Sequence, residues 1–292
     1  MTEPFAGTTI HLAHSPDSDD AFMFYALAAG KIDTRGIEYV HELQDIETLN
    51  QRALRGELEV TAVSIHAYAY LSDTYALLSH GASMGDRYGP RLVSRSPMTK
   101  SQVGGMRIAV PGPLTSAYLA LRLYEPDFDA VFMAFDAIDD AVLRGDVDAG
   151  LLIHEGQLTY AAQGLHLVAD MGEWWYGETG LPLPLGGNVI RKDLDDRLKR
   201  VVSSHLRDSI AYGLDHRSSA LDHAMQYARG LDRADADAFV GMYVNDWTLD
   251  YGDRGREAVK LLLERGVAAG IITRPVRVEF VDDGPRDDRL RA

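Results

Sequence analysis

The chain has 292 residues, of which 46% are hydrophobic and 25% charged, and its 44 acidic and 29 basic residues give a formal net charge of −15. This length can bury a large core in one or two domains, and the lack of cysteine excludes disulfides and thiolate metal sites. The negative charge disfavours nucleic acid and anionic lipid as partners, and no apolar run approaches the roughly 18 residues that predict a membrane-spanning helix.

The first 71 residues alternate between predicted strands and helices. They begin without the basic and apolar regions of a secretory signal, so we expect a cytoplasmic protein. Strands are predicted at residues 9–14, 37–43 and the start of 58–71, and helices at residues 21–30, 45–56 and the end of 58–71. This order favours a mainly parallel sheet covered by helices.

The middle of the chain repeats this scheme, and the last third is mostly helical. Strands are predicted at residues 106–112, 130–135 and 147–154, helices at 113–124 and 136–146, and crossing strands at 88–97 and 184–194. The later helices are predicted at residues 194–216, 219–230, 236–247 and 254–266. The charged tail, residues 282–292, is expected to lack regular structure.

Two tandem α/β units joined by crossing strands predict two lobes. We expect a second lobe of residues 94–189 to be inserted into a discontinuous first lobe of residues 1–93 and 190–292, which also carries the C-terminal helices. Ligand sites concentrate at domain junctions and at the carboxyl ends of parallel strands. The expected binding site is therefore the cleft between the lobes.

Three acidic residues, Asp17, Asp19 and Asp20, follow the first predicted strand. An aspartate string after a strand is typical of phosphoaspartyl phosphatases, which use Mg²⁺. That interpretation is disfavoured because Ser15 and Pro16 separate the acids from the strand, and the Gly and Thr that usually follow are missing. Two interpretations stay open for the acids, which are helix capping and a place at the rim of a ligand cleft.

Two further segments carry candidate ligand or catalytic groups. Thr115 and Ser116 stand at a predicted helix start, where a carboxylate or phosphate binds readily, although an ordinary helix cap has the same pattern. His154 ends an apolar strand and is followed by Glu155, a position that suits a general base or a structural histidine. It is not a zinc-binding HExxH motif, because Leu158 stands where the second histidine belongs.

Aromatic residues cluster at Trp174, Trp175 and Tyr176, in a segment whose glycines and prolines predict turns. Such a cluster can form the wall of a site for a flat aromatic ligand, or it can pack the two lobes together. The remaining histidines are scattered along the chain and predict no metal site.

Three longer segments together resemble the 1,4-dihydroxy-6-naphthoate synthases, a family of the futalosine route to menaquinone. They are GLLIHEGQLTY at 150–160, GEWWYGETGLPLPLGG at 172–187 and YVNDWTLDYGDRGREAV at 243–259, and the resemblance covers residues 8–282. It implies a two-lobed α/β fold of the type 2 periplasmic-binding-protein-like class with two crossing hinge strands. That architecture agrees with the two lobes predicted from the pattern of strands and helices.

The resemblance also implies a reaction. It is the cleavage of cyclic dehypoxanthinyl futalosine, an anionic, sugar-bearing aromatic precursor, into 1,4-dihydroxy-6-naphthoate and a sugar-derived fragment, without a metal or organic cofactor. His154 matches the catalytic base of the family. The implied and expected substrate contacts are Ser15, Asp17, Asp19, Asp20, Ala62, Val63, Ser64, Thr115, Ser116, Glu155 and Trp174.

The acidic loop departs from the family pattern. Asp17, Asp19 and Ala21 stand where the family usually has Cys, Asn and Thr. Because carboxylates repel an anion, we expect this rim to take the sugar hydroxyls of the substrate, and Thr115 and Ser116 to take its carboxylate. Two alternatives remain, a chorismate dehydratase of the same pathway and a solute-binding protein that captures a small acid without converting it. The segments around His154 and Trp174 disfavour the first, and the lack of a signal peptide together with His154 disfavours the second.

Overall fold

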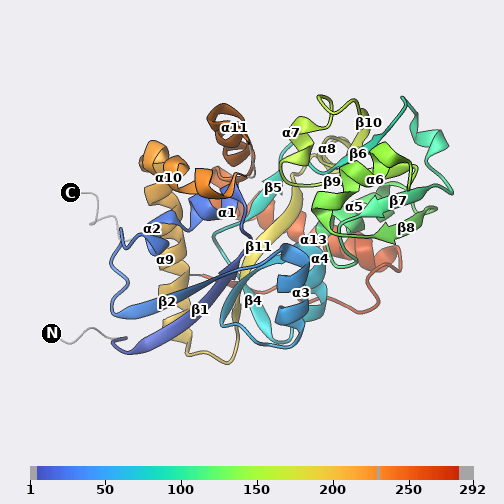
Figure 1. Cartoon of the computed structure of the whole chain (residues 1–292). Helices are drawn as coiled ribbons and strands as arrows, with labels where there is room; N and C mark the ends of the chain where they lie inside the picture. Colours follow the sequence, from blue (N-terminus) through green and yellow to red (C-terminus); the bar gives the residue numbers. More distant parts are fainter. Residues whose placement is uncertain (1–4, 229–230, 283–292) are drawn as a thin grey trace.

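The computed structural model describes residues 5–228 and 231–282, and these residues form two α/β lobes (Figure 1). The expectation for the charged tail falls on residues 283–292, which lie outside the described residues. None of the described helices has both the length and the apolar character needed to cross a membrane.

The first lobe is built on a seven-stranded sheet. Its strand order is β12-β4-β11-β3-β1-β2, and β5 pairs with β11 beside this path. Strand β1 is parallel to both of its neighbours, β2 and β3, whereas β11 is antiparallel to β3, β4 and β5. The strands are β1 (Thr8–His14), β2 (Ile37–Leu43), β3 (Val60–Ser64), β4 (Tyr75–Leu78), β5 (Ser83–Gly85), β11 (Leu183–Arg191) and β12 (Phe280–Val281).

The second lobe has a five-stranded sheet with the order β10-β6-β9-β7-β8. Strand β7 is parallel to β8 and β9, and β6 is antiparallel to β9 and β10. The strands are β6 (Arg91–Ser94), β7 (Arg107–Val110), β8 (Asp129–Phe132), β9 (Ala149–Leu152) and β10 (His166–Asp170). The predicted strand–helix order is therefore observed in both lobes, with one antiparallel strand inside each sheet.

Helices surround both sheets. In the first lobe and the C-terminal region they are α1 (Ser18–Met23), α2 (Tyr25–Ala28), α3 (Ile46–Leu54), α4 (Ile65–Leu71), α9 (Asp196–Asp215), α10 (Arg217–Ala224), α11 (Arg233–Tyr243), α12 (Asp246–Leu249) and α13 (Gly252–Ala268). In the second lobe they are α5 (Ser116–Tyr124), α6 (Ile138–Arg144), α7 (Gly156–Thr159) and α8 (Met171–Thr179). Short 3₁₀ turns cover Lys100–Gln102, Phe135–Ala137 and Met225–Tyr227.

The chain changes sheets twice. It leaves the first sheet after β5 and enters the second at β6, and it returns between the end of α8 and the start of β11. The predicted return boundary at residues 189/190 falls inside β11, all of which pairs in the first sheet. The change of sheet therefore precedes this strand, because β11 lies between β3 and β4.

The helix predicted at residues 21–30 is interrupted, and a side chain from α9 explains the break. The hydroxyl of Ser209 donates to the carbonyl of Met23 at 2.8 Å and accepts from the amide of Leu27 at 3.3 Å. It thus takes the place of the hydrogen bond that a continuous helix would form between these two residues. The result is two short helices, α1 and α2, that meet at Phe24.

The segment predicted as turns around Trp174 is instead helix α8. Asp170 caps its start by accepting from the amides of Gly172 and Glu173, at 2.9 and 3.1 Å. Gly180 ends the helix in a left-handed conformation with φ 69°. The cap and the stop residue were readable from the sequence, but the glycines between them favoured the wrong prediction.

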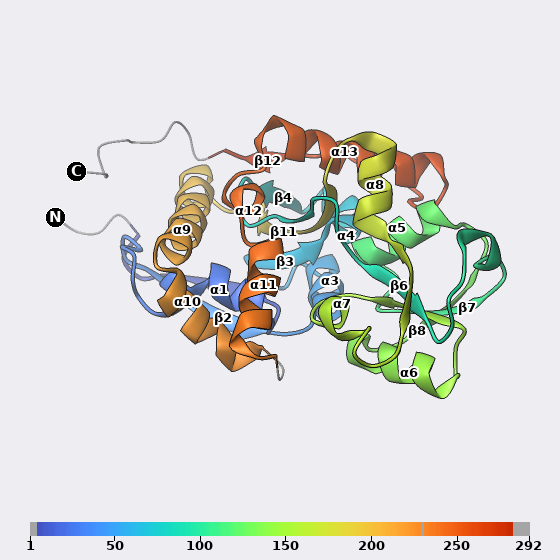
Figure 2. The same cartoon turned by 90° about the horizontal axis from the view of Figure 1, so that it is seen from above.

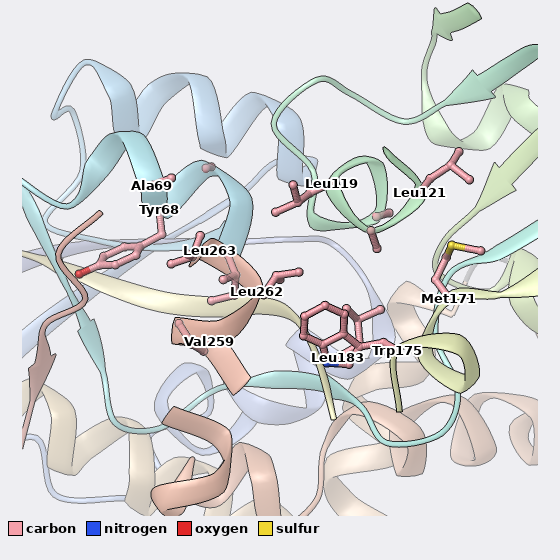
Figure 3. Packing of buried hydrophobic residues seen from close by; sticks show 14 of the residues in the cluster. Tyr68, Ala69, Leu119, Leu121, Met171, Trp175, Leu183, Val259, Leu262 and Leu263 are labelled. Atoms are coloured by element: carbon pink, nitrogen blue, oxygen red, sulfur yellow. The ribbon is translucent and has the colours of Figure 1, made fainter. Parts of the chain in front are cut away.

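The largest hydrophobic core extends through both lobes. It joins α4 and α13, which pack together in the first lobe, to α5 and α8 in the second (Figure 3). Helix α13 contacts both α4 and α5, and it runs along one side of both lobes (Figure 2). The lobes are therefore joined by buried apolar packing as well as by the two crossing segments.

Candidate functional site

A cavity lies between the two sheets, with about 770 Å³ of empty space that includes solvent at its open mouth. The predicted site residues that line it are Ser15, Asp17, Asp19, Asp20, Ala62, Val63, Ser64, Thr115, Ser116 and His154. The first seven come from the loop after β1, the first turn of α1 and the end of β3, and the last three come from the second lobe. The fold thus brings together groups that the sequence separates by more than a hundred residues.

Two predicted contacts, Glu155 and Trp174, are not among the lining residues. Glu155 is buried next to His154, where its charge acts on Asp19. Trp174 packs edge-on against Tyr124 of α5, with the ring centroids 5.5 Å apart. Helix α8 thus directs the Trp174 ring towards α5, and its expected ligand contact stays a prediction.

His154 stands where β9 turns into α7, in a backbone conformation with φ 54°. Left-handed backbone is uncommon for a residue with a side chain, although His adopts it more readily than most. The imidazole Nδ1 lies 3.0 Å from Oδ2 of Asp17. The ring of Phe135 contacts the imidazole edge-on with the centroids 4.7 Å apart. The imidazole is therefore held from two sides.

The acidic loop is organised by internal hydrogen bonds. Asp17 occupies the N-cap position of α1, but its side chain does not cap the helix. Its Oδ2 instead accepts from the hydroxyl of Ser15, besides facing His154. Oδ2 of Asp20 accepts from the amide of Ser15 at 2.7 Å. The Asp17 side chain is therefore buried and bonded to protein partners, although it also lines the cavity, and its expected contact with sugar hydroxyls stays a prediction.

Burial and mutual repulsion favour the protonated forms of two of these acids. Burial raises the pKa of Asp19 well above its usual range, and the charges of Asp20, Asp17 and Glu155 raise it further. Burial and the charge of Asp17 raise the pKa of Asp20 to about 7. Near neutral pH the loop therefore carries less negative charge than its three carboxyl groups suggest.

We predict that Asp20→Asn stabilises the protein more at pH 8 than at pH 5. The unfolded chain releases the Asp20 proton near pH 3.8, whereas the folded protein keeps it until about pH 7. The wild type therefore loses stability as the pH rises through this window, and an asparagine side chain at this position has no proton to lose. The expected gain at pH 8 is on the order of 2–4 kcal/mol in the free energy of unfolding, measured by urea denaturation at both pH values.

The matched control is Asp215→Asn, which removes an exposed acid at the end of α9. It tests whether lowering the net negative charge is sufficient to explain the effect. We expect its effect to be similar at pH 5 and pH 8. Equal effects of Asp20→Asn at the two pH values would show that Asp20 ionises as it does in the unfolded chain.

The hydroxyls at the start of α5 are occupied by protein partners. Oγ1 of Thr115 accepts from the amide of Tyr118 at 3.2 Å and donates to the carbonyl of Gly112 at 2.9 Å. Oγ of Ser116 donates to the carbonyl of Leu185 and accepts from the amide of His66. In the described part of the chain, the backbone amides of Ser116 and Ala117 have no protein acceptor. The free donors at this helix start are therefore backbone groups.

The lining also includes residues that the sequence analysis did not indicate, among them Asn188, Gln157 and Tyr243. Asn188 of β11 is buried and donates to the carbonyl of Gly81 at 3.1 Å, while its Oδ1 has no partner among the described residues. The side-chain amide of Gln157 lies 2.7 Å from the hydroxyl of Tyr243, which α11 places over the cleft. A polar residue within an apolar strand was a usable signal for Asn188. No sequence pattern connects Gln157 with Tyr243.

Within residues 5–228 and 231–282, no group of three or more His, Asp or Glu side chains is arranged to hold a metal ion.

Two lobes joined by two crossing segments, with a site in the cleft, define a periplasmic-binding-protein-like fold. The alkanesulfonate-binding protein SsuA of Xanthomonas axonopodis has this fold and superposes with a TM-score of 0.70 at 12% identity, covering 94% of this chain and 97% of that one. SsuA of Escherichia coli gives a TM-score of 0.63 at 11% identity over 93% and 96% of the two chains. At these identities the likeness concerns the fold alone.

Residues 10–268 match the family model described as menaquinone biosynthesis, and the chain belongs to this family. A 1,4-dihydroxy-6-naphthoate synthase of Thermus thermophilus is 40% identical over 272 residues, which cover 93% of this chain and 99% of the relative. A protein of the same name from Streptomyces coelicolor is 37% identical over 270 residues, covering 90% and 95%. A crystal structure of an Archaeoglobus fulgidus protein has a TM-score of 0.86 at 50% identity, covering 90% and 98%.

Proposed function

We propose that this protein is a carbon–carbon lyase that converts cyclic dehypoxanthinyl futalosine to 1,4-dihydroxy-6-naphthoate, with His154 as the general base. Two relatives that carry the name of this synthase and align over nearly the whole chain support the product. The observation that carries the chemistry is the position of His154, which follows β9, lines the interlobe cavity and pairs with the carboxylate of Asp17. A neutral imidazole in such a position suits proton abstraction.

The reaction needs one base and a fixed substrate. Breaking the bond beside the substrate's carbinol requires that a base accept a proton while the bonding electrons move into the ring system. That ring system becomes the naphthalene, and its aromaticity favours cleavage. In this proposal His154 accepts the proton, and the walls of the cavity hold the ring system and exclude competing water.

The cavity offers two kinds of polar group for the rest of the substrate. The naphthoate carboxylate would accept from the amides of Ser116 and Ala117, where the dipole of α5 favours an anion. The sugar hydroxyls would lie near Asp19 and Asp20, and one hydroxyl would donate to Oδ1 of Asn188, which has no donor among the described residues. Placing the anion away from the acidic loop follows from the repulsion between like charges.

The test is incubation of the purified protein with cyclic dehypoxanthinyl futalosine and detection of the products by mass spectrometry. We expect the mass of dihydroxynaphthoate to appear in proportion to enzyme, with the same rate in the presence of EDTA. Binding without product would support a solute-binding protein. Dehydration of chorismate in a parallel incubation would support the chorismate dehydratase alternative, and either result would overturn the proposal.

A further inference from the structure

The clearest unassigned feature of the site is an Asp–His pair that closes across the cleft. Oδ2 of Asp17 lies 3.0 Å from Nδ1 of His154, and the same oxygen accepts from the hydroxyl of Ser15. The Asp17 side chain is 2% exposed and the His154 side chain 17% exposed. A hydrogen bond to a buried carboxylate is stronger than one between neutral groups and fixes the orientation of the donor.

The pairing determines which imidazole nitrogen is basic. An ionised carboxylate only accepts hydrogen bonds, so Nδ1 carries its proton when it faces Asp17. In a neutral imidazole the lone pair then lies on Nε2. Phe135 fixes the ring from a second side, and the left-handed backbone at His154 is a local strain of the kind that persists at functional sites.

The two partners belong to different lobes. Asp17 lies in the loop after β1 of the first lobe, and His154 follows β9 of the second lobe. Neither lobe alone contains the pair, so the imidazole is oriented only while the lobes keep this spacing. The continuous core on one side of both lobes stabilises that spacing.

We propose that Asp17 is a positioning residue: its carboxylate holds His154 as the Nδ1–H tautomer and leaves Nε2 as the atom that accepts the substrate proton. The inference rests on the proposed role of His154 as base. In this proposal Asp17 acts through His154 and not through contact with the reacting atoms. Its replacement therefore changes the tautomer and the rate of the chemical step more than it changes substrate binding.

The first arm of the test measures the tautomer in the substrate-free protein. Long-range ¹H–¹⁵N spectra at pH 8.5 of protein with ¹⁵N-labelled histidine report which ring nitrogen is protonated, and the signal lost in His154→Asn identifies His154. We expect the Nδ1–H form in the wild type. Asp17→Asn should shift His154 towards the Nε2–H form, because an amide can donate to Nδ1 as well as accept from it. Asp19→Asn makes the same substitution at a neighbouring buried acid in α1, and it should keep the wild-type tautomer.

The second arm measures turnover of cyclic dehypoxanthinyl futalosine by Asp17→Asn. We expect kcat to fall roughly 10²–10³-fold and KM to change less than threefold, since orientation of the base is lost while the cavity stays intact.

The outcomes separate this inference from the proposed function. An Nε2–H tautomer in the wild type overturns the positioning role without the need for any variant. An unchanged tautomer or an unchanged kcat in Asp17→Asn also overturns it. If the tautomer shifts as expected but the wild type forms no naphthoate, the pairing stands and the proposed function fails.

Discussion

Replacing His154 by Asn is expected to lower kcat by about 10²–10⁴-fold, the usual contribution of a general base, while the protein remains folded. Asn is the appropriate substitution because it tolerates the left-handed backbone of this position, with φ 54°, whereas Ala would add strain. Asn has no titratable group to accept a proton near neutral pH. The measurement is steady-state formation of dihydroxynaphthoate, together with circular dichroism to verify the fold.

The control for this variant is His166→Asn, which alters an exposed histidine of β10 in the same lobe. We expect it to keep the wild-type kcat and KM, because it lies outside the lining of the cavity. If His154→Asn kept more than a tenth of the wild-type kcat, the proton would have to be accepted by another group. The carboxyl group of Asp20 would then be the first candidate, since it lines the cavity and its pKa is raised to about 7.

Local sequence patterns predicted many of the strands and helices, but they did not predict where a contact from a distant part of the chain interrupts or stabilises one. Strand β2 has the predicted bounds, Ile37–Leu43, because turn residues flank a β-branched and aromatic run. The first helix was predicted as continuous, since nothing near Phe24 in sequence announces the hydroxyl of Ser209. Helix α8 was missed because its glycines disfavour a helix, which forms with a capping Asp170 and a buried Trp175.

Much of the cavity lining was predictable from the sequence, but the contacts among its side chains were not. The carboxyl ends of β1 and β3, the end of β9 and the start of α5 could be placed at one cleft by the general behaviour of α/β folds. The partners of each side chain could not. The local sequence around Asp17 is compatible with a helix cap, a ligand contact or a partner of His154. Only the arrangement of the two lobes shows that it faces His154. Asn188 and Gln157 become site residues for the same reason.

The position of Trp175 explains why the two lobes form one structural unit. The indole is fully buried, donates its Nε1–H to the carbonyl of Pro182 at 3.1 Å and lies beneath the guanidinium of Arg265 from α13. Of the two interpretations offered for the aromatic cluster, packing between the lobes therefore describes Trp175. The indole joins α8, the start of β11 and α13 in one apolar cluster (Figure 3).

We expect Trp175→Ala to lower the free energy of unfolding by about 3–5 kcal/mol, since it leaves a large cavity in the core and an unpaired carbonyl at Pro182. Trp174→Ala is the matched control, because its indole is only half-buried and packs on the surface of α5. Its expected cost is less than half as large. Urea denaturation followed by circular dichroism measures both, and equal losses would show that the core does not depend on Trp175.

The same titration tests whether the core makes the lobes cooperative. Because the largest apolar cluster contains residues of both lobes, separating the lobes would expose Trp175, Leu183 and Leu262 together. Exposing this shared apolar surface to water would destabilise each isolated lobe. We therefore expect the wild type to unfold in a single transition. In Trp175→Ala the shared part of the core is weakened, and the transition should broaden as the lobes begin to unfold separately. Two resolved transitions in the wild type would contradict this view and would mean that the Asp17–His154 pair depends on the crossing segments alone.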